Sequence, residues 1–277
     1  MTNDDQREFW SDQAGPTWVA RQRAMDAQLA PVLDALLTRA DLRPGMHVLD
    51  IGCGAGQSTL RAADRTGSAL GVDISSSLLD AARRQAGDVE GVRFLLADAQ
   101  DHDFDADAFD AMISRFGTMF FGDFAAAFTN IARALKPGAR IAFATWGQIA
   151  ENPYFTLPAG IAKTHIGAVP KSDPDEPGPF ALRDVARVSR ILDAAGFVDE
   201  TAEQVPLELT PPGTRSEVAT LMCDIGPAQR ALSHFEADPE QRQMLEAAIA
   251  DALVPYETDT GIRLPALINF FTAQKPA

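Results

Sequence analysis

An acid and three glycines between residues 48 and 56 are the residues whose types and spacing point most directly to chemistry. Asp50 closes a short apolar segment, and glycines follow at alternate positions: Gly52, Gly54 and Gly56. Glycine lets the backbone turn sharply and leaves no Cβ between the chain and a ligand. The first turn of a following helix would add free N–H groups and the positive end of its dipole. The pattern therefore predicts a loop that binds a small molecule through its backbone.

The spacing of these glycines separates two classes of ligand. A dinucleotide-binding loop has the spacing G-x-G-x-x-G, but here the last position is Gln57 and the glycine comes one residue earlier, at Gly56. Asp50 lies just ahead of the first glycine, where a carboxylate is poorly placed for a pyrophosphate. The same carboxylate suits a ligand with a cationic amino group. We therefore expect a ligand with such a group and not a dinucleotide.

The segments that must position this loop alternate between strand and helix. Short apolar runs predict strands at 47–51, 69–73, 92–96, 109–114 and 139–146. Helical spacing predicts helices at 57–66, 75–85 and 123–135. This alternation is typical of a parallel doubly wound sheet. Ligands bind such sheets at the carboxyl ends of the strands, and acids and glycines fall at those ends here.

With these strand ends in place, the chain resembles the class I S-adenosylmethionine-dependent methyltransferases, in particular the UbiE-like members that act on small molecules. Residues 48–56 match the first motif of that family. Asp73, with Ile74 beside it, matches the acid that binds both ribose hydroxyls, as one carboxylate can do in a bidentate arrangement. Asp98 and Ala99, after the third strand, match the pair that contacts the adenine.

Three further segments match the same family. Ser114, Arg115 and Phe116, after the fourth strand, match the segment that lies under the methionine and faces the substrate. Residues 135–139 match the turn before the fifth strand. Trp18 lies in an N-terminal segment that resembles the cap which many small-molecule members fold over the cofactor.

The resemblance implies a Rossmann-like α/β fold with a doubly wound sheet of about seven strands, mostly parallel with an antiparallel last strand, plus helical lid and cap segments. It implies S-adenosyl-L-methionine as methyl donor and S-adenosyl-L-homocysteine as product. Cys53 would bind only through its backbone. The residues implied to bind the cofactor are Trp18, Asp50, Gly52, Cys53, Gly54, Gly56, Asp73, Ile74, Asp98, Ala99, Ser114, Arg115 and Phe116.

We expect a single domain over residues 1–277, divided into four parts. These are an N-terminal helical cap at 1–40, a cofactor-binding core at 41–147, a proline-rich lid loop at 148–182, and the C-terminal half of the sheet at 183–277 with a helical insertion at about 213–258. The third part is expected to be a loop because prolines recur through it, and proline interrupts regular structure.

Composition limits the partners. Hydrophobic residues make up 46% and charged residues 23%, an ordinary globular balance, but the net charge is -15. An acidic chain gains nothing from phosphate backbones, so we expect no nucleic-acid partner and no docking on an anionic membrane. Two cysteines, no metal-ligand spacing of Cys and His, and no visible signal segment favour a reducing, cytoplasmic location without a metal site. A monomer and a homodimer are both open.

The expected reaction is in-line transfer of an activated methyl group to an oxygen, nitrogen or carbon atom of a small molecule, for which the protein supplies proximity and orientation. A general base would be needed only for some acceptors. The candidates for a catalytic residue are His165, His234, Tyr154 and Arg115. Two alternatives stay open: an enzyme of this fold that binds the cofactor but runs another reaction, and a non-catalytic cofactor-binding protein.

Overall fold

A seven-stranded sheet forms the centre of the protein in a computed structural model, which describes residues 3–171 and 173–277. The first two residues of the predicted cap and one residue of the predicted lid, 172, lie outside the described residues. The strand order is β3-β2-β1-β4-β5-β9-β6. The strands of this sheet are β1 (His47–Ile51), β2 (Ser68–Asp73), β3 (Val92–Leu96), β4 (Phe109–Arg115), β5 (Leu135–Trp146), β6 (Val198–Leu209) and β9 (Leu264–Gln274).

Only β9 runs against its neighbours. It pairs antiparallel with both β5 and β6, whereas the pairs from β3 to β5 are all parallel. The prediction of a mostly parallel Rossmann-like sheet with an antiparallel last strand is confirmed. Residues 48–51 of the central strand β1 are all buried, as expected for a strand that is covered on both faces.

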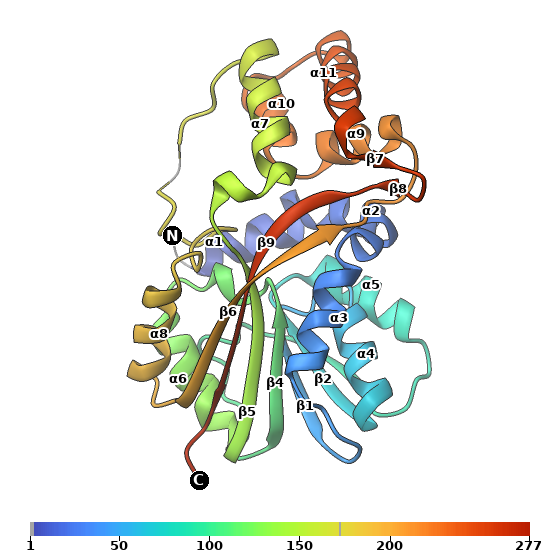
Figure 1. Cartoon of the computed structure of the whole chain (residues 1–277). Helices are drawn as coiled ribbons and strands as arrows, with labels where there is room; N and C mark the ends of the chain where they lie inside the picture. Colours follow the sequence, from blue (N-terminus) through green and yellow to red (C-terminus); the bar gives the residue numbers. More distant parts are fainter. Residues whose placement is uncertain (1–2, 172) are drawn as a thin grey trace.

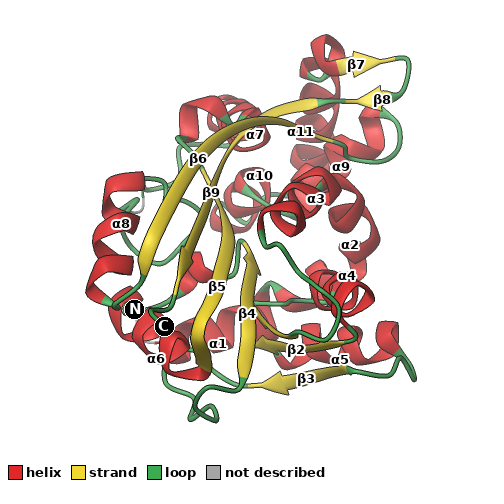
Figure 2. Cartoon of the chain, turned by 60° about the horizontal axis from the view of Figure 1, so that its bottom comes forward, coloured by secondary structure: helices red, strands yellow, loops and turns green. Residues whose placement is uncertain are grey.

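Helices cover both faces of the sheet (Figures 1 and 2). One face carries α3 (Ala30–Arg39), α4 (Gln57–Thr66) and α5 (Ser76–Ala86), and the other carries α6 (Phe124–Ala134) and α8 (Val185–Ala194). The Ser75 hydroxyl accepts the N–H of Leu78 at the start of α5, which satisfies one of the free donors of that helix. Asp123 caps α6 in the same way.

A second layer of helices stands above the strand tips, at the top of Figure 1. We call α7 and α9 to α11 the lid. Near the lid lie two 3-10 turns and a two-stranded hairpin. The bounds are α7 (Pro153–His165), α9 (Arg215–Asp224), α10 (Pro227–His234), α11 (Pro239–Ala252), η3 (Ile149–Glu151), η4 (Val254–Tyr256), β7 (Glu257–Thr258) and β8 (Gly261–Ile262).

The N-terminal segment lies between the sheet and the lid (Figure 1). We call it the cap; it consists of α1 (Asn3–Glu8), the π-helical turn η1 (Phe9–Gln13) and α2 (Gly15–Gln28). The cap ends where α2 ends, at Gln28, and α3 begins at Ala30 with Pro31 in its first turn. Proline is tolerated there because the N–H it lacks has no partner in the helix anyway.

Two predictions of local structure are wrong. Residues 148–182 are not a continuous loop, because Pro153–His165 form α7. Pro153 starts this helix, and Pro158 is accommodated inside it, so two of the prolines that suggested a loop lie within a helix. Lys136, Pro137 and Gly138 are not a separate turn: β5 already begins at Leu135, and its register with β4 shifts between Phe109 and Ala111.

Candidate functional site

The glycine loop joins β1 to α4 at the carboxyl edge of the sheet. Its three glycines are all left-handed, with φ of 64° at Gly52, 55° at Gly54 and 91° at Gly56, a region that residues with a Cβ adopt at a cost. A Cβ at Gly54 would meet no atom within 4 Å, so the space above the loop is open. A Cβ at Gly52 would lie 2.5 Å from the Cα of Gly117, at the tip of β4. The loop therefore leaves room for a ligand on one side and presses against a neighbouring strand on the other.

Asp50 is a buried carboxylate at the base of this loop. It is fully inaccessible, and its Oδ2 accepts the hydroxyls of Ser58 and Thr59, both at 2.6 Å. Its Oδ1 has no hydrogen-bond partner among the residues that the structure describes. Burial raises the pKa of Asp50 to about 6, against the opposing effect of the two hydroxyls. A buried carboxylate oxygen without a donor fits the cationic amino group that the sequence predicts for the ligand.

Asp73 ties the end of β2 to the glycine loop. Its Oδ2 accepts the N–H of Gly54 at 2.7 Å, and its Oδ1 accepts the N–H of Ser75 at 2.8 Å. Burial raises the pKa of Asp73, and these backbone donors oppose that effect. Each oxygen keeps a second lone pair, so the carboxylate can still accept the two hydroxyls of a ribose. Ile74, which follows it, is half-buried.

Asp98 follows β3 and is in contact with the cap. The Nδ2 of Asn3 donates to Asp98 Oδ2, and the Oδ1 of Asn3 accepts the N–H of Gly122 at 2.9 Å. An amide NH2 group therefore already binds the carboxylate that the resemblance assigns to the adenine. Ala99 is buried beside it. The sequence analysis missed Asn3, although the acids at positions 4 and 5 are typical of a first helical turn.

The cap crosses the tips of β2 and β4. The carbonyl of Trp10 accepts the Ser75 hydroxyl at 2.7 Å, which fixes η1 over the start of α5. The Trp10 ring packs edge-on against Phe120, with centroids 5.1 Å apart, and against Trp18 at 5.7 Å. Trp10 thus joins the cap to the segments that follow β2 and β4. Trp18, the residue that the sequence favoured for a cap contact, packs behind Trp10.

Ser114 and Arg115 anchor the tip of β4. The Ser114 hydroxyl donates to the carbonyl of Ile51 at 2.7 Å, which joins β4 to the end of β1. Arg115 donates to Gln57 Oε1 at 2.6 Å and pairs with Asp26 of α2 at 3.2 Å. Burial raises the pKa of Asp26, although Arg115 opposes it. Arg115 thereby fastens the cap to the start of α4.

Phe116 begins an aromatic wall beyond the glycine loop. It has φ of 68°, which is unusual for a residue with a Cβ. Its ring stacks on Trp146 at the end of β5, with centroids 4.5 Å apart and planes 3° from parallel. Tyr154 and Phe155 of α7 then pack against Trp146 at 6.2 and 4.9 Å. These rings form an apolar cluster next to the strand tips, in which Trp146 and Tyr154 are buried and Phe116 and Phe155 are half-buried.

The four candidates for a catalytic residue lie in different surroundings. His165 and His234 are exposed, on α7 and α10. Tyr154 is buried, which raises its pKa to about 12, so its phenol is neutral at physiological pH and is a hydrogen-bond donor rather than a base. Arg115 is engaged with Asp26 and Gln57. The buried Cys53 thiol also has a pKa well above its usual value and is held as an unreactive thiol.

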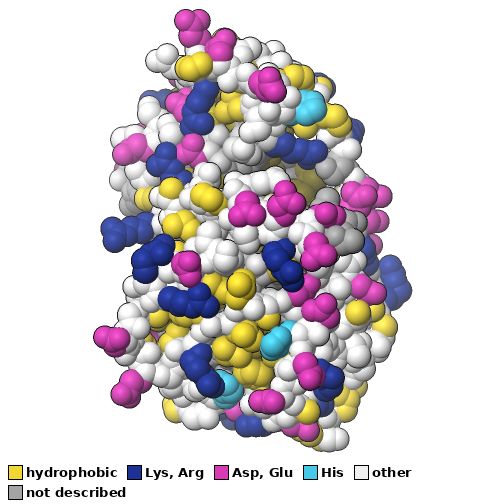
Figure 3. Space-filling model, turned by 180° about the vertical axis from the view of Figure 1, so that it is seen from behind, with side chains coloured by type: hydrophobic (Ala, Val, Ile, Leu, Met, Phe, Trp, Pro, Cys, Tyr) yellow, Lys and Arg dark blue, Asp and Glu magenta, His cyan; other side chains and the backbone are white. Residues whose placement is uncertain are grey.

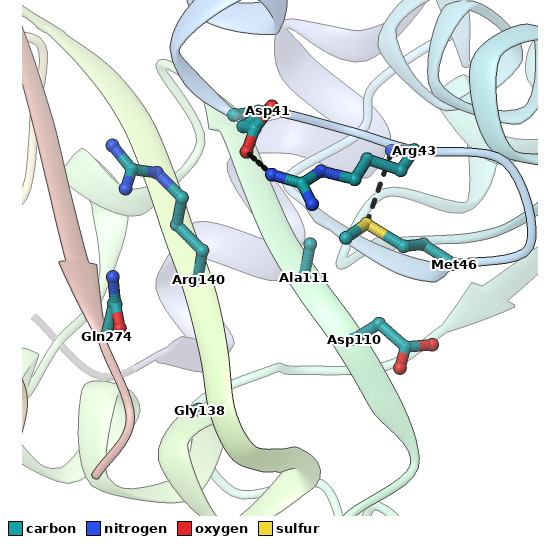
Figure 4. Close-up of a pocket in the computed structure, with 9 residues that line it drawn as sticks. Asp41, Arg43, Met46, Asp110, Ala111, Gly138, Arg140 and Gln274 are labelled. Carbon is teal, nitrogen blue, oxygen red and sulfur yellow. Dashed lines mark hydrogen bonds and ion pairs between the residues drawn. The ribbon is translucent and has the colours of Figure 1, made fainter. Parts of the chain in front are cut away.

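A separate hollow lies at the opposite edge of the sheet, where strands begin rather than end (Figure 4). Its polar groups are already used within the fold. Arg43 pairs with Asp41 at 2.6 Å, Asp110 accepts Lys136 at 2.7 Å, and Arg140 donates to Thr272 at 3.0 Å. This hollow is therefore not the predicted ligand site.

We call the region around the glycine loop, at the carboxyl ends of β1 to β4, the crevice. We predict that substitution of Gly117, which is packed against backbone, destabilises the protein more than substitution of Gly54, which has open space beside it. In Gly117→Ala the new Cβ would lie 2.5 Å from the Ile51 carbonyl and 2.6 Å from the Cα of Gly52, so backbone must move at a cost of about 3 kcal/mol. Gly54→Ala meets no atom and should cost roughly 1–2 kcal/mol, the strain of a left-handed alanine. Urea unfolding of the ligand-free proteins measures both; equal losses would contradict this account of the loop.

We predict that ionisation of Asp50 lowers the free energy of unfolding as the pH rises from about 4 to about 6. The folded-state pKa of about 6 exceeds the ordinary aspartate pKa of 3.8. The folded protein therefore holds this proton more tightly, and its stability falls as pH rises through that window. Asp50→Asn keeps an acceptor for Ser58 and Thr59 and removes the charge. Its stability relative to the wild type should rise by at most about 3 kcal/mol from pH 4 to pH 7. Urea titrations across this range would contradict the prediction if the difference were constant.

Comparison with known proteins agrees with this geometry. Residues 48–138, from β1 to the start of β5, match the family model described as a methyltransferase domain. Nocamycin O-methyltransferase of Saccharothrix syringae is 30% identical over 212 residues, which is 68% of this chain and 72% of the relative. Demethylmenaquinone methyltransferase of Staphylococcus aureus is 31% identical over 103 residues, 36% of this chain and 43% of the relative.

Two solved structures share the fold. Phosphoethanolamine N-methyltransferase 2 of Haemonchus contortus, in complex with S-adenosyl-L-methionine, has a TM-score of 0.62 and 21% identity, over 98% of this chain and 60% of that one. The [4+2]-cyclase SpnF has a TM-score of 0.54 and 22% identity, over 89% of this chain and 81% of that one. The fold alone therefore accommodates more than one reaction. The match to nocamycin O-methyltransferase and the match to the methyltransferase domain assign this chain to the family of class I S-adenosylmethionine-dependent methyltransferases.

Proposed function

We propose that this protein transfers the methyl group of S-adenosyl-L-methionine to a small, largely apolar acceptor that lies along the aromatic wall begun by Phe116. The observation that carries the proposal is the Oδ1 of Asp50, a buried carboxylate oxygen with no donor among the described residues. It lies at the base of a loop with open space above Gly54. A ligand that combines an ammonium group with a nucleoside would satisfy both features.

The residues of the crevice fit this cofactor in order along the sheet. Asp50 would face the ammonium group of the methionine, and the backbone of the glycine loop would follow the methionine chain. Asp73 would accept the ribose hydroxyls with the lone pairs that the N–H groups of Gly54 and Ser75 leave free. Asp98 would accept the adenine amino group, and for this the amide of Asn3 must move aside.

The cofactor, when bound, supplies a methyl group already activated on a sulfonium. The contribution of the chain is then to hold the acceptor in line and to exclude water. The stacked rings of Phe116 and Trp146 would provide apolar contacts beside the place where the methionine end would lie. The cap and the lid helices cover this surface.

The states of the four candidate residues favour an acceptor that can be methylated without a general base. Tyr154 is a neutral phenol, Arg115 is ion-paired, and both His165 and His234 are exposed. We therefore propose an acceptor whose nucleophilic atom is ionised, or carries a free lone pair, at neutral pH. The name of nocamycin O-methyltransferase supports an oxygen acceptor.

The surface supports a small acceptor rather than nucleic acid. The net charge is -15, and on the face shown in Figure 3 acidic side chains lie scattered among Lys and Arg without a continuous basic stripe. Such a surface gives little attraction for a phosphate backbone. Within residues 3–171 and 173–277, no helix has the length and apolar character needed to cross a bilayer.

We predict that the protein binds S-adenosyl-L-homocysteine in isothermal titration calorimetry and that Asp73→Asn weakens this binding about 100-fold. The amide leaves one acceptor oxygen where the carboxylate had two, so charge-assisted hydrogen bonds to the ribose are lost. Asp110→Asn, at the opposite end of the sheet, is the matched control and should bind as the wild type does. Equal affinity of all three proteins would exclude the assigned cofactor crevice.

We predict methyl turnover, which separates this proposal from a non-methylating enzyme of the same fold such as the cyclase SpnF. Incubation with radiolabelled S-adenosyl-L-methionine and a metabolite extract should transfer label to an organic-soluble product and release S-adenosyl-L-homocysteine. Asp73→Asn is the control and should transfer far less label at a cofactor concentration below its dissociation constant. Cofactor binding without label transfer to any fraction would favour the non-methylating alternative.

A further inference from the structure

Gln28, the last residue of α2, has a polar side chain in a fully buried position. Its exposed fraction is 0%, and neither its Nε2 nor its Oε1 makes a hydrogen bond of normal geometry to any described residue. Leaving such groups unsatisfied costs roughly 1–3 kcal/mol each. Buried polar groups without partners are rare in folded proteins, so this carboxamide calls for a role other than packing.

Tyr154, on α7, presents a second buried polar group to the same place. Its side chain is 4% exposed, and its hydroxyl lies 3.4 Å from the carbonyl of Ile225, at the long limit for a hydrogen bond. The Gln28 carboxamide lies close enough to the hydroxyl to lower the pKa of Tyr154, against the larger effect of burial. The next residue, Gly226, lies next to this hydroxyl: a Cβ there would be 3.8 Å from it, in ordinary van der Waals contact.

The aromatic wall connects this pair to the cofactor crevice. Gly117 touches Gly52 of the glycine loop through its Cα, and Phe116 precedes it in the chain. The rings of Phe116 and Trp146 are stacked, and the Trp146 ring is only 13° from parallel with that of Tyr154. Gln28 and Tyr154 therefore lie at the far end of a stack of aromatic rings that starts where the methionine end of the cofactor is assigned.

We propose that Gln28 and Tyr154 determine acceptor specificity by binding a carbonyl or hydroxyl oxygen, other than the atom that receives the methyl group, on an uncharged part of a flat acceptor whose body lies beside Phe116 and Trp146. This inference rests on the proposed function. The Nε2 of Gln28 and the hydroxyl of Tyr154 are both donors and would share one acceptor oxygen, while the Oε1 of Gln28 would take the proton of a hydroxyl.

The charges around the pair favour an uncharged group on this part of the acceptor. Both side chains are neutral, and the nearby wall is aromatic. Arg115 is already paired with Asp26, and Asp224, which precedes Ile225, is paired with Arg21 and Arg242. A carboxylate on the acceptor would be buried here without a counter-ion, which is costly. The pair thus discriminates by hydrogen bonding, and a site built for a hydrogen bond rejects analogues that lack the matching group.

The test uses the complex of the full chain with S-adenosyl-L-homocysteine and two probes of the same shape, 2-naphthol and naphthalene. Binding is measured by ligand-observed NMR titration. The wild-type complex should bind 2-naphthol at least about 10-fold more tightly than naphthalene, the effect of one or two buried hydrogen bonds. Gln28→Leu and Tyr154→Phe should each abolish this preference, leave naphthalene binding unchanged and leave the affinity for S-adenosyl-L-homocysteine unchanged.

The stability of the Gln28→Leu variant shows whether Gln28 has a role in specificity or only a structural role. Because Gln28→Leu removes unsatisfied polar atoms, it should unfold at the same or a higher urea concentration than the wild type. The matched controls are Gln229→Leu, on an exposed face of α10, and Tyr256→Phe, the other tyrosine of the chain; both should keep the preference for 2-naphthol. The inference is overturned if the wild type shows no preference, if either test variant keeps it, or if Gln28→Leu is markedly destabilised. Absence of S-adenosyl-L-homocysteine binding by the wild type would instead overturn the proposed function.

Discussion

Two buried carboxylates at neighbouring strand tips are the constraint on which the rest of this site depends. Asp50 and Asp73 both have raised pKa values because burial disfavours their charged forms, and the charge of Asp73 adds to the effect on Asp50. The fold meets this cost only in part, through the hydroxyls of Ser58 and Thr59 and the backbone N–H groups of Gly54 and Ser75. A ligand with an ammonium group would supply the missing partner, so binding and folding stability are coupled in this crevice.

The elements above the strand tips are joined to the crevice by a few long-range polar contacts. Arg115 links the cap helix α2 to the start of α4 through Asp26 and Gln57, and Asn3 links α1 to Asp98. The cap therefore rests on the same residues that are assigned to the cofactor. Cofactor binding in the crevice and the position of the cap over it are therefore coupled.

The sequence was sufficient to predict the core and much of the crevice. The strand at 47–51 and the helix at 57–66 were predicted with their observed bounds, because an apolar run that ends in glycines limits both. The prolines of 148–182 misled, since Pro153 is favourable at a helix start and Pro158 is tolerated within α7. Asn3 and Trp10 were not identified as contacts, because their partners lie far away in the chain and no local pattern reveals them, and no local pattern reveals that Gln28 is fully buried. The raised pKa of Tyr154 likewise depends on tertiary burial.

The close approach of β1 and β4 has a consequence for how this family can diverge. Gly52 and Gly117 approach each other so closely that neither position has room for a side chain. A larger residue at one of them could be accommodated only by a displaced backbone at the other. In an alignment of relatives, these two columns should therefore vary together or not at all, and relatives with a substitution at both should hold their strand tips further apart.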